Sequence, residues 1–167
     1  MMDSRDISPA ILACALALVL APLARAAGEA SAAGAYVKPE MKHESYGETR
    51  IVVPLTSGEK RIQIMKLRNI KNAFKAADAW GGKLDLRLVL YSDGVSMLAN
   101  PDEDLRKGID ELRALGLQIE VCNNTLLERG IDFHSLYRVS NNDMVPSGFA
   151  EVAYLQSKLH FAVDPSN

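Results

Sequence analysis

The chain has 167 residues, a formal net charge of −2 and 24% charged residues. This balance gives no broad positive charge, so nucleic acid and anionic membrane surfaces are excluded as expected partners. The length suits one domain of ordinary size.

An uninterrupted apolar run, Ile11–Ala21, lies near the N-terminus and is followed by the small-x-small sequence Ala24-Arg25-Ala26. The run is too short to span a hydrocarbon core, which takes about 20 helical residues, and it has the length typical of a secretory signal. We predict that residues 1–26 are a signal peptide, that the protein is exported to the periplasm or secreted, and that no membrane segment remains after cleavage. An uncleaved anchor is the alternative.

The sequence contains two cysteines, Cys14 and Cys122. Because Cys14 leaves with the predicted signal peptide, the exported protein has one thiol and can form no intramolecular disulfide. A single thiol in an oxidising compartment is either buried and inert or reactive and used. Residues 27–49 are rich in Gly, Ala, Ser and Glu without apolar periodicity, so they predict a flexible tether before a folded domain at 50–167.

The first half of this domain alternates strand and helix. Residues 51–55 predict a strand, and Thr56-Ser57-Gly58-Glu59 has the spacing of a helix capping box. The following helix continues to about Trp80, and Gly81-Gly82 ends it. Residues 84–91 predict a second strand, and residues 100–103 start a second long helix with Pro in its first turn. The predicted buried positions of the two helices are Leu67, Ile70, Phe74 and Ala77, then Leu105, Ile109, Leu112 and Leu115.

The second half repeats the alternation. Residues 117–121 predict a third strand, and a short helix from about Thr125 stops at Gly130. A fourth strand ends at residues 144–146, Ser147 caps a helix reaching about Lys158, and residues 159–163 predict a fifth strand. Repeated strand–helix order predicts an open, doubly wound α/β fold with a mostly parallel sheet of about five strands.

Cys122 directly follows the third predicted strand. Open α/β sheets carry their sites at the carboxyl ends of strands, and the amides of a helix N-terminus there favour a thiolate and lower its pKa. Strand alternation places Cys122 on the side of Gln118 and Glu120, which favours a wet cleft or a subunit contact. The alternative is that Cys122 is a small buried hydrophobe at a strand end.

Further polar residues are candidates for the same site. They open and end the short helix or follow the second strand: Asn123, Asn124, Thr125, Arg129, Ser92 and Asp93.

Other motifs point less directly to function. The turn at Thr56–Lys60 resembles a phosphate cradle but lacks the second glycine and the Lys-Ser/Thr pair of a P-loop, so we predict no cofactor. His43, His134 and His160 have no ligand spacing, so no metal site is predicted. A basic run on the first helix is usually a solvated face and otherwise a docking surface for an anion; it consists of Lys60, Arg61, Lys66, Arg68, Lys71 and Lys75.

The stretch from Val121 to Ile131, Val-Cys-Asn-Asn-Thr-Leu-Leu-Glu-Arg-Gly-Ile, resembles the DsrE/DsrF-like family. Members carry a cysteine directly after the third strand, followed by a short helix and an Arg-Gly turn. The segment Val145-Pro146-Ser147-Gly148 resembles the turn that opens the family's last helix. The resemblance covers roughly residues 50–163 and implies a three-layer, flavodoxin-like open sheet, assembly into trimers or hexamers, and relay of sulfur as a persulfide on Cys122.

We therefore expect an exported, DsrE-like homo-oligomer that takes sulfane sulfur from a donor onto Cys122 and passes it to an acceptor. Asn123, Asn124 and the following amides stabilise the anion, with Arg129 nearby. Such a protein is at most a sulfurtransferase-like carrier, and the sequence leaves open whether it is an enzyme. The alternatives are a non-catalytic homo-oligomeric binding or scaffold module with a structural Cys122, and a flavin- or nucleotide-binding domain.

Overall fold

The computed structural model describes residues 40–164, so the predicted signal peptide and residues 27–39 of the predicted tether lie outside the described residues. The described part holds one five-stranded sheet with the order β4-β3-β2-β1-β5, in which every pairing is parallel. The predicted open α/β fold is confirmed. The strands are β1 (Gly47–Leu55), β2 (Gly82–Leu90), β3 (Gln118–Cys122), β4 (Met144–Val145) and β5 (Ala162–Val163).

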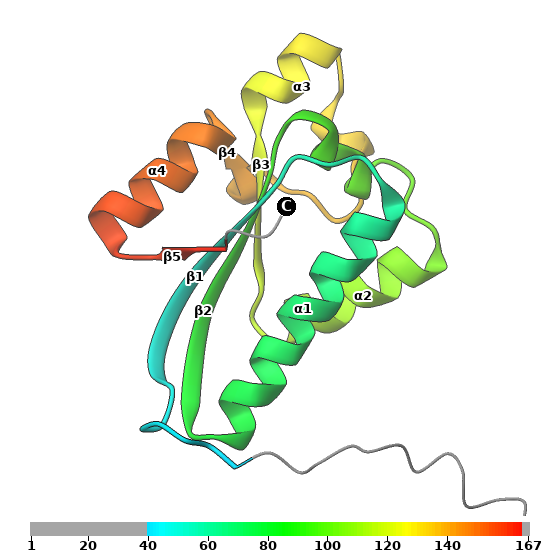
Figure 1. Ribbon diagram of the computed structural model, residues 1–167. Coiled ribbons are helices and arrows are strands. Elements are labelled where there is room, and N and C mark those ends of the chain that lie inside the picture. The colour runs from blue at the N-terminus through cyan, green and yellow to red at the C-terminus, as the bar shows by residue number, and fades with distance from the viewer. Residues whose placement is uncertain (1–39, 165–167) are drawn as a thin grey trace, which may run out of the picture. The chain divides into compact units, whose positions relative to one another are not determined.

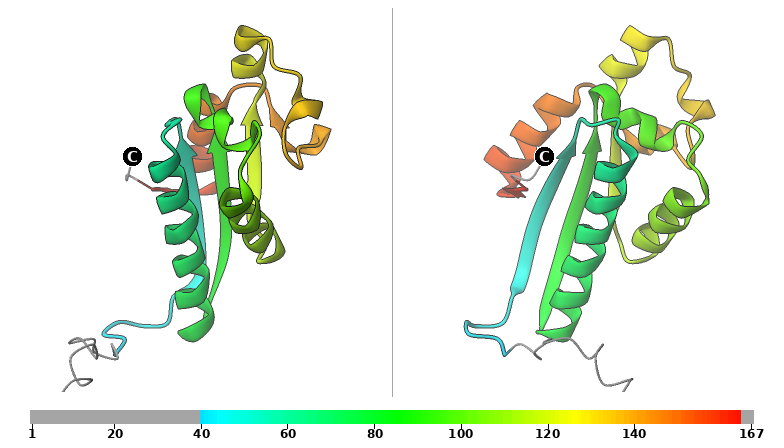
Figure 2. Two further views of the ribbon diagram at one scale, coloured as in Figure 1. Left: turned by 90° about the vertical axis from the view of Figure 1, so that its right-hand side faces the viewer. Right: turned by 45° about the vertical axis from the view of Figure 1, so that its right-hand side comes forward.

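Helices cover both faces of the sheet. Helices α1 (Lys60–Ala79) and α2 (Glu103–Ala114) lie on one face, and α4 (Gly148–Leu159) lies on the other (Figure 1, Figure 2). Helix α3 (Asn123–Arg129) extends beyond the carboxyl end of β3. Short 3-10 turns are η1 (Ser92–Leu98), η2 (Phe133–Ser135) and η3 (Asn141–Asp143). No helix in the described part of the chain is long and apolar enough to cross a membrane.

The core divides into two clusters because side chains alternate between the faces of each strand. The larger cluster, under α1 and α2, includes Leu88, Ile109 and Val121. The smaller one, under α4, contains Val52, Val89, Leu155 and Phe161. The predicted buried stripe of α1 is confirmed at Leu67, Ile70 and Ala77, with Phe74 partly buried, and that of α2 at Leu105, Ile109 and Leu112; Leu115 is exposed.

Strand β1 begins earlier than predicted. It pairs with β2 from Gly47 opposite Gly82 onward, so it includes the last residues of the predicted tether. Tyr46, just before the strand, stacks on Trp80 with ring centroids 5.9 Å apart. This aromatic pair packs at the amino ends of β1 and β2 and stabilises strand residues that precede the apolar run.

The predicted capping box at the start of α1 is wrong. The N-cap residue is Glu59, and its side chain makes no capping hydrogen bond to the helix. The Glu59 N–H instead donates to Ser57 Oγ (3.1 Å). The buried Gln63 amide holds the turn by donating to Ser57 O (3.2 Å) and Ser96 Oγ (3.1 Å). The turn is therefore packed against η1, a contact between segments that are distant in sequence.

Strand β5 is shorter than predicted because α4 continues to Leu159. His160 then takes a left-handed conformation (φ 58), which ends the helix, and the Phe161 N–H donates to Leu155 O (3.0 Å). Only after this turn can the chain pair with β1, where Ile51 lies opposite Ala162.

Candidate functional site

Cys122 is both the last residue of β3 and the N-cap of α3. The helix begins at Asn123, two residues earlier than predicted, and the Thr125 N–H donates to Cys122 Sγ (3.5 Å). A cysteine therefore takes the place of the Ser, Thr or Asp that ordinarily caps a helix. The prediction that the chain passes from a strand to a helix at Cys122 is confirmed. The Cys122 thiol accepts a hydrogen bond from the first turn of that helix.

The first turn of α4 lies against the same thiol. The Gly148 N–H points to the thiol closely enough to lower the pKa of Cys122, and Asn124 N–H donates to Pro146 O (3.2 Å), which ties α3 to the turn before α4. A side chain at Gly148 is excluded, because its Cβ would lie 2.9 Å from both Cβ and Cδ1 of Tyr91. The glycine of the Val-Pro-Ser-Gly turn thus permits the close approach that brings its amide to the sulfur.

These hydrogen bonds decide the ionisation of Cys122. Burial raises the pKa of the thiol, but the Thr125 hydroxyl and the N–H groups of Gly148, Thr125 and Asn124 act in the opposite direction. The net result is a thiol pKa below its usual value. Stabilisation comes from short-range hydrogen bonds and not from a nearby basic side chain.

The thiol lies on the predicted face of the sheet, but at Cys122 that face is covered and excludes solvent. Cys122 shares the α4 face with Glu120, whereas Ile119 and Val121 belong to the cluster on the opposite face. Cys122 is only 5% exposed, because Gly148 and Tyr91 lie over it. The expectation of a wet cleft is therefore wrong at the thiol itself. Burial, and then the Cys122 charge, raise the pKa of Tyr91.

The loop after β2 supports Thr125. The Ser92 N–H donates to Thr125 Oγ1 (3.1 Å), and Ser92 has a left-handed backbone (φ 50), which is uncommon for a residue with a side chain. Because the Ser92 amide occupies an acceptor position of the hydroxyl, the hydroxyl proton is free to point at Cys122 Sγ. The structure thus brings Ser92 and Thr125 together at the sulfur.

The other predicted residues lie around this centre. Arg129 Nη2 pairs with Asp93 Oδ1 (2.7 Å); both side chains are largely exposed, so the pair stabilises the fold only weakly. Arg129 therefore binds the η1 loop and not the thiol. Asn123 and Asn124 are exposed, and within residues 40–164 neither side chain hydrogen-bonds to the sulfur. Asn123 lines a groove of ≈ 340 Å³ beside α3.

Two residues of the site were missed. Tyr91 and Gly148 contact across the sheet edge although they are far apart in sequence. The Val-Pro-Ser-Gly turn was the available signal for Gly148, and nothing local marked Tyr91. Among the described residues, no group of three or more His, Cys, Asp or Glu side chains is arranged to hold a metal ion.

A second polar cluster lies under α4, two residues before the thiol on β3. Glu120 Oε1 accepts from Arg87 Nη1 (2.8 Å), and Arg87 also lies 5.3 Å from the centroid of the Phe161 ring. Glu120 Oε2 has no hydrogen-bond partner among residues 40–164. Burial raises the pKa of Glu120, although Arg87 acts to lower it.

This raised pKa gives a pH-dependent stability. Since the folded state holds the Glu120 proton more tightly than the unfolded state, its contribution is present below the unfolded pKa of about 4.3 and is lost as pH rises through the folded value. Glu120→Gln removes that loss, so the variant is expected to gain stability relative to wild type as pH rises from 4 to 8 (roughly 1 kcal/mol). Urea unfolding across this range measures the difference; a constant difference would contradict the assignment.

Comparison with known proteins agrees with the fold. The model of the DsrE/DsrF-like family matches residues 62–162. A solved structure described as a protein of unknown function, MTH1491 from Methanobacterium thermoautotrophicum, has a TM-score of 0.61 at 23% identity; the match covers 70% of this chain and 97% of that one. A comparison with curated proteins finds no match. The fold and the family model together place the chain among flavodoxin-like α/β proteins, and it belongs to the DsrE/DsrF-like family.

Proposed function

We propose that this protein is an exported carrier of sulfane sulfur that forms a persulfide on Cys122. The observation that carries the proposal is the set of donors at the sulfur, the Thr125 hydroxyl and three N–H groups, which hold the thiol pKa below its usual value. A thiolate is the nucleophilic form of cysteine. Membership of the DsrE/DsrF-like family supports the assignment, and the N-terminal apolar run supports export.

The proposed chemistry is two thiol exchange steps. The Cys122 thiolate attacks the outer sulfur of a persulfide or polysulfide donor, so an S–S bond forms on Cys122 while the donor's S–S bond breaks and the donor leaves as a thiolate. An acceptor thiolate then attacks the outer sulfur of the Cys122 persulfide, and Cys122 leaves as the thiolate. No net oxidation or reduction occurs, and the donors that stabilise the free thiolate also stabilise it as leaving group.

The burial of Cys122 favours a second candidate, a non-catalytic binding or scaffold module. At 5% exposure the cysteine also suits a small structural residue that caps α3 and packs against Tyr91. In that case substitution of Cys122 by serine leaves the activity intact, because serine is itself a good helix cap.

The deciding experiment is to incubate the folded protein with polysulfide and locate added sulfur by peptide mass spectrometry. We expect one added sulfur atom on the Cys122 peptide and none at that position in Cys122→Ser; mapping separates any adduct on Cys14. Alkylation by a small electrophile provides the second measurement. A thiol that takes no sulfur and reacts only after unfolding would establish the structural role instead.

A further inference from the structure

The basic run on α1 is divided by the structure into paired and unpaired cations. Three of its members contact acids on other elements: Lys60 with Asp102, Lys66 with Asp164 and Lys71 with Glu111. Lys66 is 1% exposed, so the expected solvated face is wrong at this position, which lies on the buried stripe of α1. Arg61, Arg68 and Lys75 form no ion pair within residues 40–164.

The three unpaired cations form one row along the helix. Arg61, Arg68 and Lys75 are spaced seven residues apart, which advances an α-helix by about 10.5 Å and returns to within about 20° of the same direction. All three are exposed. We call Arg61, Arg68 and Lys75 the cation row; it is about 21 Å long.

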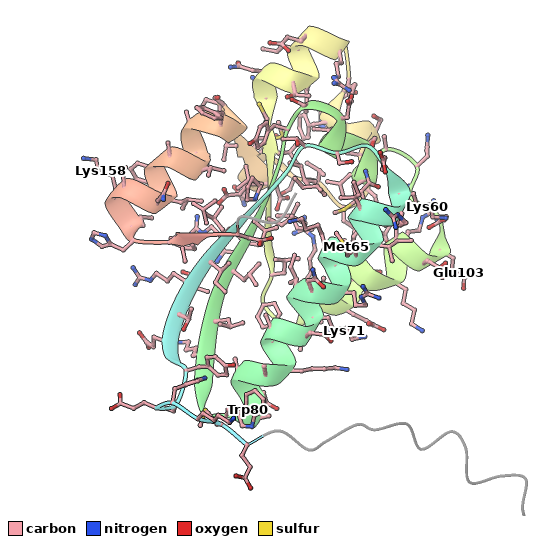
Figure 3. All side chains as sticks on the ribbon, viewed as in Figure 1. Lys60, Met65, Lys71, Trp80, Glu103 and Lys158 are labelled. Atoms are coloured by element: carbon pink, nitrogen blue, oxygen red, sulfur yellow. The ribbon has the colours of Figure 1, made fainter. Side chains whose placement is uncertain are left out.

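An apolar side chain interrupts this row. Ile64 lies between the first two cations and is 39% exposed, and the neighbouring Met65 is partly exposed. Figure 3 shows Lys60, Met65 and Lys71 in succession along α1. Arg61, Ile64, Met65 and Arg68 line a groove of ≈ 550 Å³ together with Lys60 and Ile62. The surface therefore offers cations for charge and an apolar centre for packing.

The surroundings limit how wide the partner can be. Helix α2 lies beside α1 and carries Asp104, Lys107 and Glu111, which line a second groove with Ile64, Arg68 and Lys71. Glu103 is exposed at the start of α2, near the Lys60–Asp102 pair. A broad anionic surface, such as a lipid bilayer or a nucleic acid, would meet these acids and be repelled. A partner only one helix wide can follow the cation row along α1 without covering α2.

We propose that the cation row and Ile64 dock an acidic amphipathic helix of a partner protein. Carboxylates at seven-residue intervals on that helix match the spacing of the row, because both follow the same helical rise. An apolar side chain between the first two carboxylates packs on Ile64. The docking surface is made by α1 and does not depend on the chemistry of Cys122.

The test uses a fluorescently labelled synthetic helical peptide with Glu at positions i, i+7 and i+14 and Leu between the first two. Anisotropy titration of the full chain is expected to show saturable binding that weakens with salt. Arg61→Glu, Arg68→Glu and Lys75→Glu together are expected to weaken binding about a hundredfold. Reversal of three exposed cations elsewhere, Lys42, Lys83 and Lys158, changes the net charge equally and should alter affinity by no more than about threefold. Circular dichroism verifies that both variants fold.

Several outcomes would overturn the proposal. The first is that the patterned peptide does not bind. The second is that a peptide of the same composition with its acids scrambled binds with the same affinity. The third is that both triple variants lose the same amount of affinity for the patterned peptide. Tighter binding to anionic phospholipid vesicles or to heparin, lost in the row variant, would assign the surface to a different class of partner. Ile64→Ser provides a separate readout, since it should weaken peptide binding several-fold without changing the salt dependence.

Discussion

Gly94→Ala is expected to destabilise the domain by about 3 kcal/mol or more. A Cβ at this position would lie 1.9 Å from Leu55 O and 2.6 Å from Leu55 C. Both atoms belong to the backbone at the carboxyl end of β1, and the same oxygen accepts from the Tyr91 N–H (3.2 Å). The contact can be relieved only by moving η1 away from β1, which breaks the support of the loop that carries Ser92. Equilibrium unfolding in urea measures the loss.

Gly108→Ala is the matched control for Gly94→Ala. Its Cβ would lie 3.1 Å from Leu67 Cδ1, the far end of a flexible side chain, and alanine gains up to about 1 kcal/mol over glycine inside a helix. We expect its free energy of unfolding to stay within about 1 kcal/mol of wild type. A Gly94→Ala protein as stable as the control would show that η1 does not pack on β1 as described.

Thr125→Val is expected to raise the pKa of the Cys122 thiol and to slow its alkylation at neutral pH by about tenfold, the effect of losing one hydrogen bond to a charged group. Valine keeps the shape of threonine but removes the hydroxyl that acts on the sulfur. It also leaves the Ser92 N–H without its acceptor. The rate of alkylation as a function of pH separates a shift in pKa from a change in access, because only the first moves the midpoint.

Thr125→Ser supplies the control for the hydroxyl. Serine retains the donor, so the midpoint is expected to stay close to that of wild type. Linkage gives an independent measurement. Because the folded state lowers the thiol pKa, Cys122 contributes stability that is present above the unfolded pKa and is lost as pH falls through the folded value. Thr125→Val should weaken this dependence, and an unchanged midpoint and an unchanged dependence would show that Thr125 does not stabilise the thiolate.

The strand and helix order was predictable because it depends on local patterns. The position of Cys122 between β3 and α3 follows from an apolar run that ends where a helix begins. The second long helix is confirmed, but its N-cap is Asp102, whose side chain accepts from the Leu105 N–H (3.1 Å), so Pro101 precedes the helix and does not lie in its first turn. Repeated alternation of such segments permits few topologies. The parallel sheet was therefore a consequence of the element order and needed no knowledge of contacts.

The failed predictions share a dependence on contacts between distant segments. Closure of the thiol by Gly148 and Tyr91 needs the α4 turn to meet the end of β2. The burial of Lys66 needs Asp164 on the far edge of the sheet (2.8 Å). The turn before α1 forms no capping box because Gln63 holds it against Ser96 of η1. No periodicity along the chain contains such information.

The stacked pair of Tyr46 and Trp80 has a practical consequence for spectroscopy. Trp80 is the only tryptophan of the chain and lies at the amino ends of β1 and β2, at the lower end of the view in Figure 3. The thiol lies at the carboxyl end of β3, the opposite edge of a parallel sheet. Tryptophan fluorescence should therefore report unfolding of the sheet and should not change when sulfur is added to Cys122. A fluorescence measurement can thus distinguish a modified protein from an unfolded one.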